Sequence, residues 1–224
     1  MSNIKISKRL CTASLYVRDG AVLADIGTDH AYLPIYLALE GKIKSAIASD
    51  INVGPIKKAE ENICKNNLRD TIYTNVANGL DGIEKYAPTD IAICGMGGEL
   101  IAQILESSSY VKNQSIRLIL QPMTSVKELR EYLQNGYSTI AENVVCEDGK
   151  IYQIICAEYD GNHHPMTSVE LEIGRKNLEN KGSNVDSLIF STIAKKQKKL
   201  EGLKLGGYDT KDVEKEIMEL ESLI

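Results

Sequence analysis

The sequence contains no tryptophan and a single phenylalanine, so tyrosine is the main aromatic residue available to stack against a flat ligand. Its five cysteines form no C-x-x-C pair, which gives no metal framework and suits a reducing compartment. No apolar run approaches the roughly 18 residues of a membrane span, and the first residues lack the apolar core of a signal peptide. We therefore expect a cytoplasmic protein without a metal or a membrane partner.

The sequence also lacks an excess of positive charge, since its formal net charge is −5. Taken whole, that is not the composition of a nucleic-acid-binding domain. Two local basic clusters stand out, and residues 1–18 contain no acidic residue. The clusters consist of Lys5, Lys8, Arg9 and Arg18, and of Lys195, Lys196, Lys198 and Lys199. Each cluster permits contact with nucleic acid, although a solvated helix face is the better explanation of either cluster taken alone.

A dinucleotide-binding fingerprint is missing from the stretch that organises the chain, residues 21–34 (AVLADIGTDHAYLP). The stretch predicts a buried strand, a turn at Gly27 and a helix that Thr28 and Asp29 can cap. A G-x-G-x-x-G site would have glycine where Asp29 stands, and this carboxylate would repel a pyrophosphate. S-adenosylmethionine, which carries an ammonium, a sulfonium and a ribose but no phosphate, fits better. An ordinary turn with a capping aspartate remains the alternative.

Strand and helix patterns alternate up to about residue 160. Expected strands cover residues 21–26, 45–49, 71–77, 90–94 and 117–120, expected helices cover 7–17, 32–39, 55–66, 99–106 and 124–134, and strands 138–145 and 150–157 form a closing hairpin. Five strand–helix units and a hairpin predict an α/β fold with a seven-stranded, mostly parallel sheet. The closing hairpin is typical of the class I, Rossmann-like methyltransferase version of this fold.

The sequence after the hairpin is helical, over residues 169–181, 185–205 and 210–223. Its apolar stripes are narrow and its other faces are charged, which favours a helical hairpin resembling an antiparallel coiled coil. We therefore predict a Rossmann-like catalytic domain over residues 1–162 and a helical coiled-coil domain over residues 163–224.

Ligands of such sheets bind outside the carboxyl ends of the strands, so the residues at those ends are the candidate site. They are Asp25, Gly27, Thr28, Asp29 and His30 at the first strand, Asp50 and Ile51 at the second, Asn78, Gly79 and Leu80 at the third, and Cys94, Gly95 and Met96 at the fourth. Asp50 can accept hydrogen bonds from ribose hydroxyls, with a helix cap as the alternative. Asn78 can pair with an adenine edge and Leu80 can pack on the ring. The glycines of residues 95–98 (GMGG) let the backbone approach a ligand closely.

The segments ADIGTDHAYLP, ASDIN, NGL, ICGMGGELI and LQP, followed by a helical hairpin, resemble the bacterial tRNA adenine-22 N1-methyltransferases, the TrmK family. The resemblance covers the whole chain. It implies methyl transfer from S-adenosylmethionine to N1 of one adenine near the D-arm of tRNA. The basic residues expected to contact tRNA phosphates are Lys5, Lys8, Arg9, Lys195, Lys196, Lys198 and Lys199.

The residues agree with this chemistry. Adenine N1 is a lone-pair nucleophile that needs no strong base, so positioning against the sulfonium methyl can carry catalysis, once the base is unpaired or flipped. The product is cationic, and a nearby carboxylate would stabilise it. Asp29 is the best catalytic candidate, although it can instead hold the cofactor ammonium, and His30 is the second candidate. Tyr32 and Tyr86 could stack on a base, or pack in the core.

Two other function classes remain open. One is a methyltransferase that acts on a small molecule or a protein, with the helical segment as a lid or a dimer contact. The other is a non-catalytic scaffold that retains the fold. The missing phosphate loop disfavours a dehydrogenase. The oligomeric state stays open, with a monomer favoured.

Overall fold

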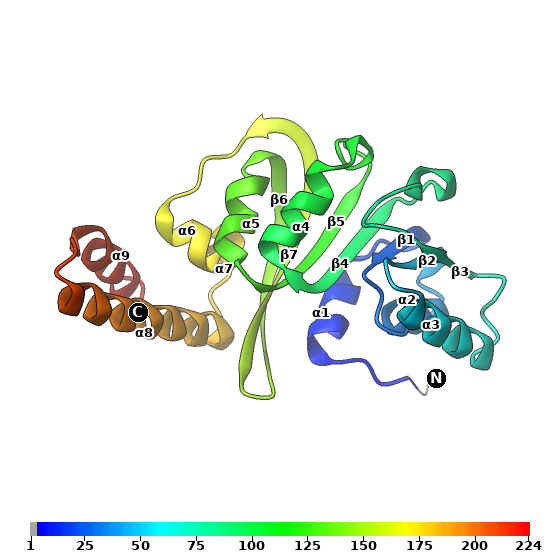
Figure 1. Ribbon diagram of the computed structural model, residues 1–224, viewed down its shortest axis with the longest axis horizontal. Helices are drawn as coiled ribbons and strands as arrows, with labels where there is room; N and C mark the ends of the chain where they lie inside the picture. The colour runs from blue at the N-terminus through cyan, green and yellow to red at the C-terminus, as the bar shows by residue number, and fades with distance from the viewer. Residues whose placement is uncertain (1–3) are drawn as a thin grey trace.

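Seven strands form one sheet in the computed structural model, which describes residues 4–224 (Figure 1). The strands are β1 (Ala21–Ile26), β2 (Ile43–Asp50), β3 (Ile72–Val76), β4 (Asp90–Gly97), β5 (Arg117–Thr124), β6 (Asn135–Glu147) and β7 (Lys150–His163). Their order is β3-β2-β1-β4-β5-β7-β6, with β1 to β5 parallel and the last two antiparallel. The predicted sheet and its terminal hairpin are confirmed. Residues 1–3 of the predicted first domain lie outside the described residues.

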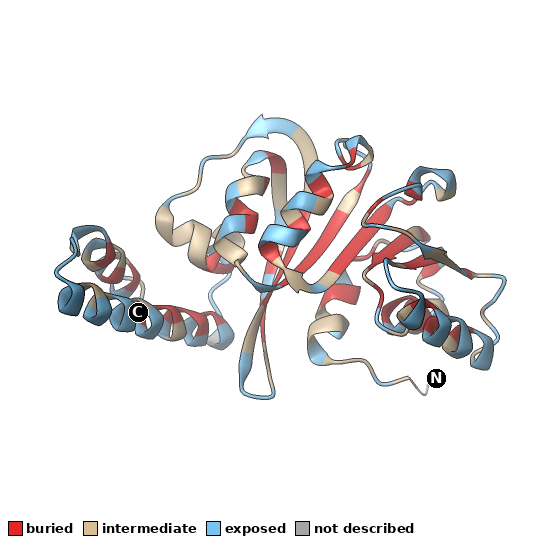
Figure 2. Ribbon diagram, in the orientation of Figure 1, coloured by how far each residue is buried: buried red, intermediate tan, exposed pale blue. Residues whose placement is uncertain are grey.

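Helices cover both faces of the sheet. One face carries α1 (Lys8–Tyr16), α2 (Tyr32–Leu39) and α3 (Val53–Lys65), and the other carries α4 (Gly98–Glu106), α5 (Val126–Leu133) and the 3-10 turns η1 (Ile83–Tyr86) and η2 (Ser109–Val111). Neighbouring residues of one strand enter different cores, as Leu23 does on the first face and Ala24 on the second. Because both faces are covered, the central strands are nearly continuous apolar runs, buried in Figure 2.

The strand order reverses beside β1. The chain builds β2 and β3 on one side of β1 and then returns to place β4 on the other side, so that Asp25 pairs with Ala48 and with Ala92. In open sheets of this kind the crevice at such a switch point, at the carboxyl ends of the strands, holds the ligand. The sequence-predicted residues therefore converge at one edge of the sheet.

The glycine-rich end of β4 remains in the sheet. The pattern predicts a strand over residues 90–94, whereas β4 continues to Gly97, which pairs with Thr124 of β5. The register is irregular between Cys94 and Met96 and again between Met96 and Gly97, and Gly95 has a φ of 87°. Glycine accepts this backbone conformation, so the strand bulges where a stiffer sequence would leave the sheet.

Four helices follow the sheet: α6 (Ser168–Ile173), α7 (Arg175–Glu179), α8 (Ser183–Gly206) and α9 (Lys211–Glu221). The predicted continuous helix over residues 169–181 is wrong, because the chain turns at Gly174, whose φ is 96°. A Cβ atom at this position would collide with the side chains of Glu142 and Arg130. Helix α8, about 36 Å long at the usual rise, packs with α9 around a third apolar cluster that includes Ile189, Ile193 and Ile217.

A buried ion pair attaches the helical segment to the sheet. The guanidinium of Arg130, on α5, is 1% exposed, and its Nη2 donates to Oε1 of Glu142 on β6 at 2.6 Å and to Oε1 of Gln153 on β7 at 2.7 Å. Nη1 donates to the backbone oxygen of Leu171 at 2.9 Å, and the other carboxylate oxygen of Glu142 accepts the N–H of Lys176 at 2.9 Å. One polar network therefore joins α5, β6 and β7 to the start of the helical segment.

Within residues 4–224, no helix has both the length and the apolar character needed to cross a membrane.

Replacing Arg130 with methionine tests this network. The change leaves the carboxylate of Glu142 buried without its cation, so we expect the free energy of unfolding to fall by about 3–5 kcal/mol. Denaturant unfolding followed by far-ultraviolet circular dichroism measures it. As a control, Lys215→Met removes an exposed ion pair to Glu219 and should cost less than about 1 kcal/mol. Equal, small losses in both variants would show that the network does not stabilise the fold.

Candidate functional site

A cavity of about 260 Å³ lies at the carboxyl end of β1, where the strand order reverses. Three parts of the chain line it: the segment that leads into α1, the turn from β1 to α2, and the end of β4. The lining residues are Lys5, Ile6, Ser7, Arg9, Leu10, Asp25, Gly27, Asp29, Tyr32, Leu33 and Cys94. The structure thus places Asp25, Gly27, Asp29 and Cys94, each predicted from the sequence, around one cavity.

The turn after β1 is fixed by backbone hydrogen bonds. Gly27 has a φ of 70°, and the N–H groups of Gly27 and Thr28 both donate to the backbone oxygen of Ser49, at 2.8 and 2.9 Å. A Cβ atom at position 27 would also collide with the methyl group of Met96. Glycine is favoured here for its φ, whereas the terminal methyl group of Met96 belongs to a flexible side chain that could move aside.

The predicted helix cap by Thr28 and Asp29 is wrong. The hydroxyl of Thr28 donates to Oδ2 of Asp25 at 2.6 Å instead. Helix α2 starts only at Tyr32, after two residues with left-handed backbone, and its N-cap position makes no side-chain hydrogen bond. The side chain of Asp29 consequently stays free to project toward the cavity.

Asp25 is a buried carboxylate at the end of β1, 6% exposed. Burial raises its pKa to about 6; the hydrogen bond from Thr28 opposes this rise and the nearby charge of Asp29 adds to it. Among the described residues, no lysine, arginine or histidine forms an ion pair with Asp25. A carboxylate in this position is complementary to a cationic ligand, which would lower its pKa again.

Asp29 lines the cavity with an exposed side chain, and His30 contacts it without being one of the lining residues. The side chain of Asp29 is 83% exposed, and its Oδ1 lies 3.0 Å from Nε2 of His30. The ring of His30 stacks on that of Tyr32, with 5.3 Å between the centroids. This group presents one exposed carboxylate and two flat rings beside the buried Asp25.

The ends of β2 and β3 continue the same edge of the sheet. Oδ1 of Asp50 accepts the N–H of Asn52 at 2.7 Å, and the neighbouring Ile51 is 61% exposed. Asn78 is exposed, whereas the side chain of Leu80 is buried in the core with residues of α4. The packing of Leu80 on an adenine ring therefore lacks support from its side-chain position.

At the end of β4, Cys94 is partly buried, and desolvation raises the pKa of its thiol to about 12, so the sulfur stays protonated at neutral pH. One of the adjacent glycines is explained by packing. A Cβ atom on Gly98 would collide with the backbone oxygen of Ser125, so this glycine is needed for close packing between α4 and the start of α5.

Sequence reasoning missed two polar residues at strand ends. Gln121, at the end of β5, is fully buried and accepts a hydrogen bond from Nη1 of Arg9 at 2.7 Å. Ser49, just before Asp50, has a buried hydroxyl without a hydrogen-bond partner among the described residues. In both cases the sequence signal was a polar residue directly after the apolar run of a strand.

The predicted phosphate contacts occupy different environments. Lys5 and Arg9 line the cavity, whereas Lys8 is exposed on α1. Lys195 and Lys199 line a separate groove of about 520 Å³ between α8 and the start of α5.

Lys196, on the same groove, is 12% exposed and binds Glu172 at 2.7 Å and Glu216 at 2.8 Å. Desolvation lowers the pKa of Lys196, but these hydrogen bonds outweigh it and raise the pKa above the usual value. Two carboxylates therefore already neutralise Lys196, while Lys198 is exposed.

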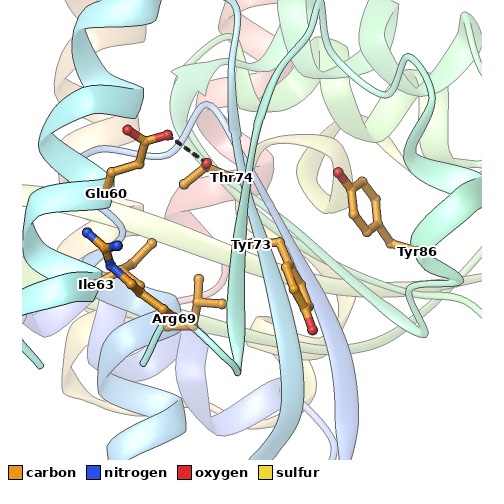
Figure 3. A pocket seen from close by; sticks show the side chains of 7 residues that line it. Glu60, Ile63, Arg69, Tyr73, Thr74 and Tyr86 are labelled. Atoms are coloured by element: carbon orange, nitrogen blue, oxygen red, sulfur yellow. Dashed lines mark hydrogen bonds between the residues drawn. The ribbon is translucent and has the colours of Figure 1, made fainter. Parts of the chain in front are cut away.

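Tyr86 lies in another cavity, on the outer edge of the sheet between α3 and β3 (Figure 3). Its ring stacks on Tyr73, with 6.3 Å between centroids, and Glu60 and Thr74 form a hydrogen bond on the other side of the strand. Of the two tyrosines predicted near the site, only Tyr32 lines it. Within residues 4–224, no group of three or more potential metal ligands gathers.

Comparison with known proteins identifies relatives over most of the chain. Residues 6–155 match a family model described as a methyltransferase domain. A tRNA (adenine(22)-N(1))-methyltransferase of Bacillus subtilis is 41% identical over 175 residues, which span 78% of this chain and 74% of that protein.

Solved structures are similar over nearly the full length. The B. subtilis m1A22 tRNA methyltransferase TrmK gives a TM-score of 0.82 at 34% identity, covering 98% of this chain and 96% of that chain. M. capricolum TrmK, in complex with the cofactor product S-adenosyl-homocysteine, gives 0.82 at 31% identity, covering 97% and 96%.

The raised pKa of Asp25 predicts a pH dependence of stability. The folded protein binds this proton more tightly than the unfolded chain, so the stabilisation is complete below the ordinary pKa of 3.8 and is lost as the pH rises through about 6. Relative to Asp25→Asn, the wild type should lose about 3 kcal/mol of unfolding free energy between pH 3.5 and pH 7. Denaturant titrations of both proteins across this range measure it, and parallel pH curves would contradict the assignment.

Proposed function

Because this chain belongs to the family of tRNA (adenine(22)-N(1))-methyltransferases, we propose that it transfers a methyl group from S-adenosylmethionine to N1 of adenine-22 in tRNA. The observation that carries the proposal is the extent of the likeness. It covers the C-terminal helical segment as well as the sheet. The sheet alone would be less informative, because methyltransferases with other substrates have it too. The proposal places the enzyme in the cytoplasm, acting as a monomer.

The residues of the crevice fit S-adenosylmethionine, which supplies an electrophilic methyl group on a cationic sulfur. Asp25 is buried without a basic partner, as a site for a cationic ligand requires. Asp50 and the unpaired hydroxyl of Ser49 end the neighbouring strand, where a ribose would lie. The compact turn at Gly27 leaves room for a ligand without phosphates.

The cofactor contacts proposed from the sequence therefore remain our assignment. They are Asp25, Gly27, Thr28, His30, Asp50, Ile51, Asn78, Gly79, Leu80, Cys94, Gly95 and Met96. For Leu80 the contact would come from its backbone, since its side chain lies in the core. For Cys94 it would come from a neutral thiol, since the pKa is raised to about 12.

Asp29 remains our assignment for the catalytic carboxylate. Its exposed side chain lines the same cavity as Asp25. The lone pair of adenine N1 needs no base, and the reaction moves positive charge from the sulfur to the adenine ring. A fixed carboxylate beside the ring stabilises that charge as it develops. Tyr32, 37% exposed and stacked on His30, offers a ring against which the base can lie.

The groove between α8 and α5 is our proposed tRNA contact. Lys127, Lys195 and Lys199 line it, and the extended end of β5 forms its other wall. In Figure 1, α8 and α1 lie on either side of the β6–β7 hairpin, so Lys5 and Lys8 would extend the basic surface past the reaction crevice. Phosphate contacts of this kind position RNA without reading its sequence.

The position of methylation is tested with two unmodified tRNA transcripts, one with adenine and one with guanine at position 22. Each is incubated with the enzyme and cofactor and then used as a template for primer extension, which stops at a base whose pairing edge is methylated. We expect a stop at position 22 in the first transcript and none in the second. A stop elsewhere, or in both transcripts, would reject the position that we propose.

The role of Asp29 is tested with Asp29→Asn. Removing the charge should lower kcat about 100-fold, because one preorganised electrostatic contact is lost, while the Kd for the cofactor stays within about threefold. Single-turnover methylation and calorimetry measure the two quantities. Asp19→Asn, which removes an exposed carboxylate before β1, is the matched control. A raised cofactor Kd with an unchanged rate at saturation would move Asp29 to the cofactor site.

Charge reversal tests the groove. The double variant Lys195→Glu, Lys199→Glu should bind tRNA at least about tenfold more weakly and show a shallower dependence of affinity on salt. Lys215→Glu, on the exposed face of α9, is the control and should change neither quantity by more than about twofold. Filter binding at several salt concentrations measures both, and an unchanged affinity in the double variant would remove α8 from the interface.

A further inference from the structure

Arg9 lies inside the reaction crevice and not on the open surface of α1. We propose that its guanidinium binds the α-carboxylate of S-adenosylmethionine, and that Gln121 is the positioning residue that holds the guanidinium there. This inference rests on the proposed function for its cofactor but not for its RNA substrate. It replaces the tRNA phosphate that the sequence suggested as the partner of Arg9.

Two contacts hold the guanidinium of Arg9 in place. Its Nη1 donates to Oε1 of Gln121 at 2.7 Å, and its central carbon lies 5.9 Å from the ring centroid of Tyr152. Gln121 is itself fixed, because it is fully buried and its Nε2 donates to the backbone oxygen of Pro122 at 2.9 Å. That bond orients the amide oxygen toward Arg9.

The backbone of Arg9 is fixed as well. The hydroxyl of Ser7 accepts the N–H of Leu10 and caps α1, and the N–H of Lys8 donates to Oε1 of Glu147 at 2.5 Å. Glu147 belongs to the end of β6, so the hairpin holds the first turn of α1 against the crevice. Because both the backbone and the guanidinium of Arg9 are held in place, the side chain loses little further conformational entropy when a ligand binds, and this favours tight binding.

The charges around Arg9 discriminate between two anionic ligands. The cavity that Arg9 lines also contains the carboxylates of Asp25 and Asp29, which would repel an RNA phosphate entering it. The amino-acid end of S-adenosylmethionine carries an ammonium and a carboxylate on one carbon. Asp25 on β1 and Arg9 on α1 line the same cavity with opposite charges, and these charges match the pair.

The chemistry of the Arg9–Gln121 pair suits a carboxylate ligand. Gln121 accepts through a neutral amide, so it orients the guanidinium without neutralising it. A guanidinium has five N–H donors, of which Gln121 engages one, and its planar fork matches the two oxygens of a carboxylate. An acidic residue at position 121 would instead compete with the ligand for the same charge.

The test compares two cofactor forms by calorimetry, without tRNA. S-adenosylmethionine and decarboxylated S-adenosylmethionine share the nucleoside, the sulfonium and the amine, and differ only in the carboxylate. Each is titrated into the wild type, Arg9→Met, Gln121→Met and the control Lys65→Met, which removes an exposed cation of α3. Circular dichroism and thermal melting establish that each variant is folded.

We expect the wild type and Lys65→Met to bind the carboxylated form about 10- to 100-fold more tightly than the decarboxylated form. Arg9→Met should lose this preference while binding the decarboxylated form as the wild type does. Gln121→Met should reduce the preference by about 3- to 10-fold, because the guanidinium remains but is no longer held. A structural defect alone would weaken both forms equally and leave the preference intact.

Two results would overturn the inference. One is a wild type that binds both forms equally, a result that needs no variant and leaves the proposed methyltransferase function standing. The other is an unchanged preference in Arg9→Met, which would show that the guanidinium does not bind the carboxylate and would return Arg9 to the RNA interface. Failure of the wild type to bind either form would contradict the proposed function as well.

Discussion

A carboxylate buried at the end of β1 determines how this edge of the sheet is arranged. Asp25 sits between two neighbouring strands, where desolvation raises its pKa to about 6 and one hydroxyl, that of Thr28, is its hydrogen-bond donor. Ionising a carboxyl group in this position costs free energy unless a cation lies beside it. The tight turn at Gly27 and the side chain of Arg9 line the same cavity as Asp25. A cofactor with a cationic centre and no phosphates answers this constraint, and a dinucleotide does not.

A second buried charge, Arg130, sets the relation between the sheet and the helical segment. Its ion pair with Glu142 leaves no space for a side chain at position 174, and glycine there also permits the turn between α6 and α7. This geometry puts the lysines of α8 on a groove whose other wall is the end of β5. The same strand carries Gln121, whose side chain accepts the hydrogen bond from Arg9. Strand β5 therefore contributes both to this groove and to the contact with Arg9.

The sequence predicts the parts of this structure that local patterns specify. All seven predicted strands and the turn at Asp148 and Gly149 are present, although β4 to β7 extend beyond the ranges that the pattern gave. What it does not predict depends on pairs of side chains far apart in the chain. Arg9 and Gln121 are separated by 112 positions, and no periodicity indicates that they meet. The ion pairs of Lys196 with Glu172 and Glu216 could not be predicted for the same reason. In the sequence all four lysines of this cluster look equally exposed, and only the fold places two carboxylates beside one of them.

The most direct test of the account is the identity of the product. Unmodified tRNA is incubated with this enzyme and S-adenosylmethionine labelled in the methyl group, digested to nucleosides and separated by chromatography. The account predicts that the label appears in N1-methyladenosine and in no other nucleoside. Label in N6-methyladenosine or in a methylated guanosine, or no transfer from enzyme that binds the cofactor, would contradict it.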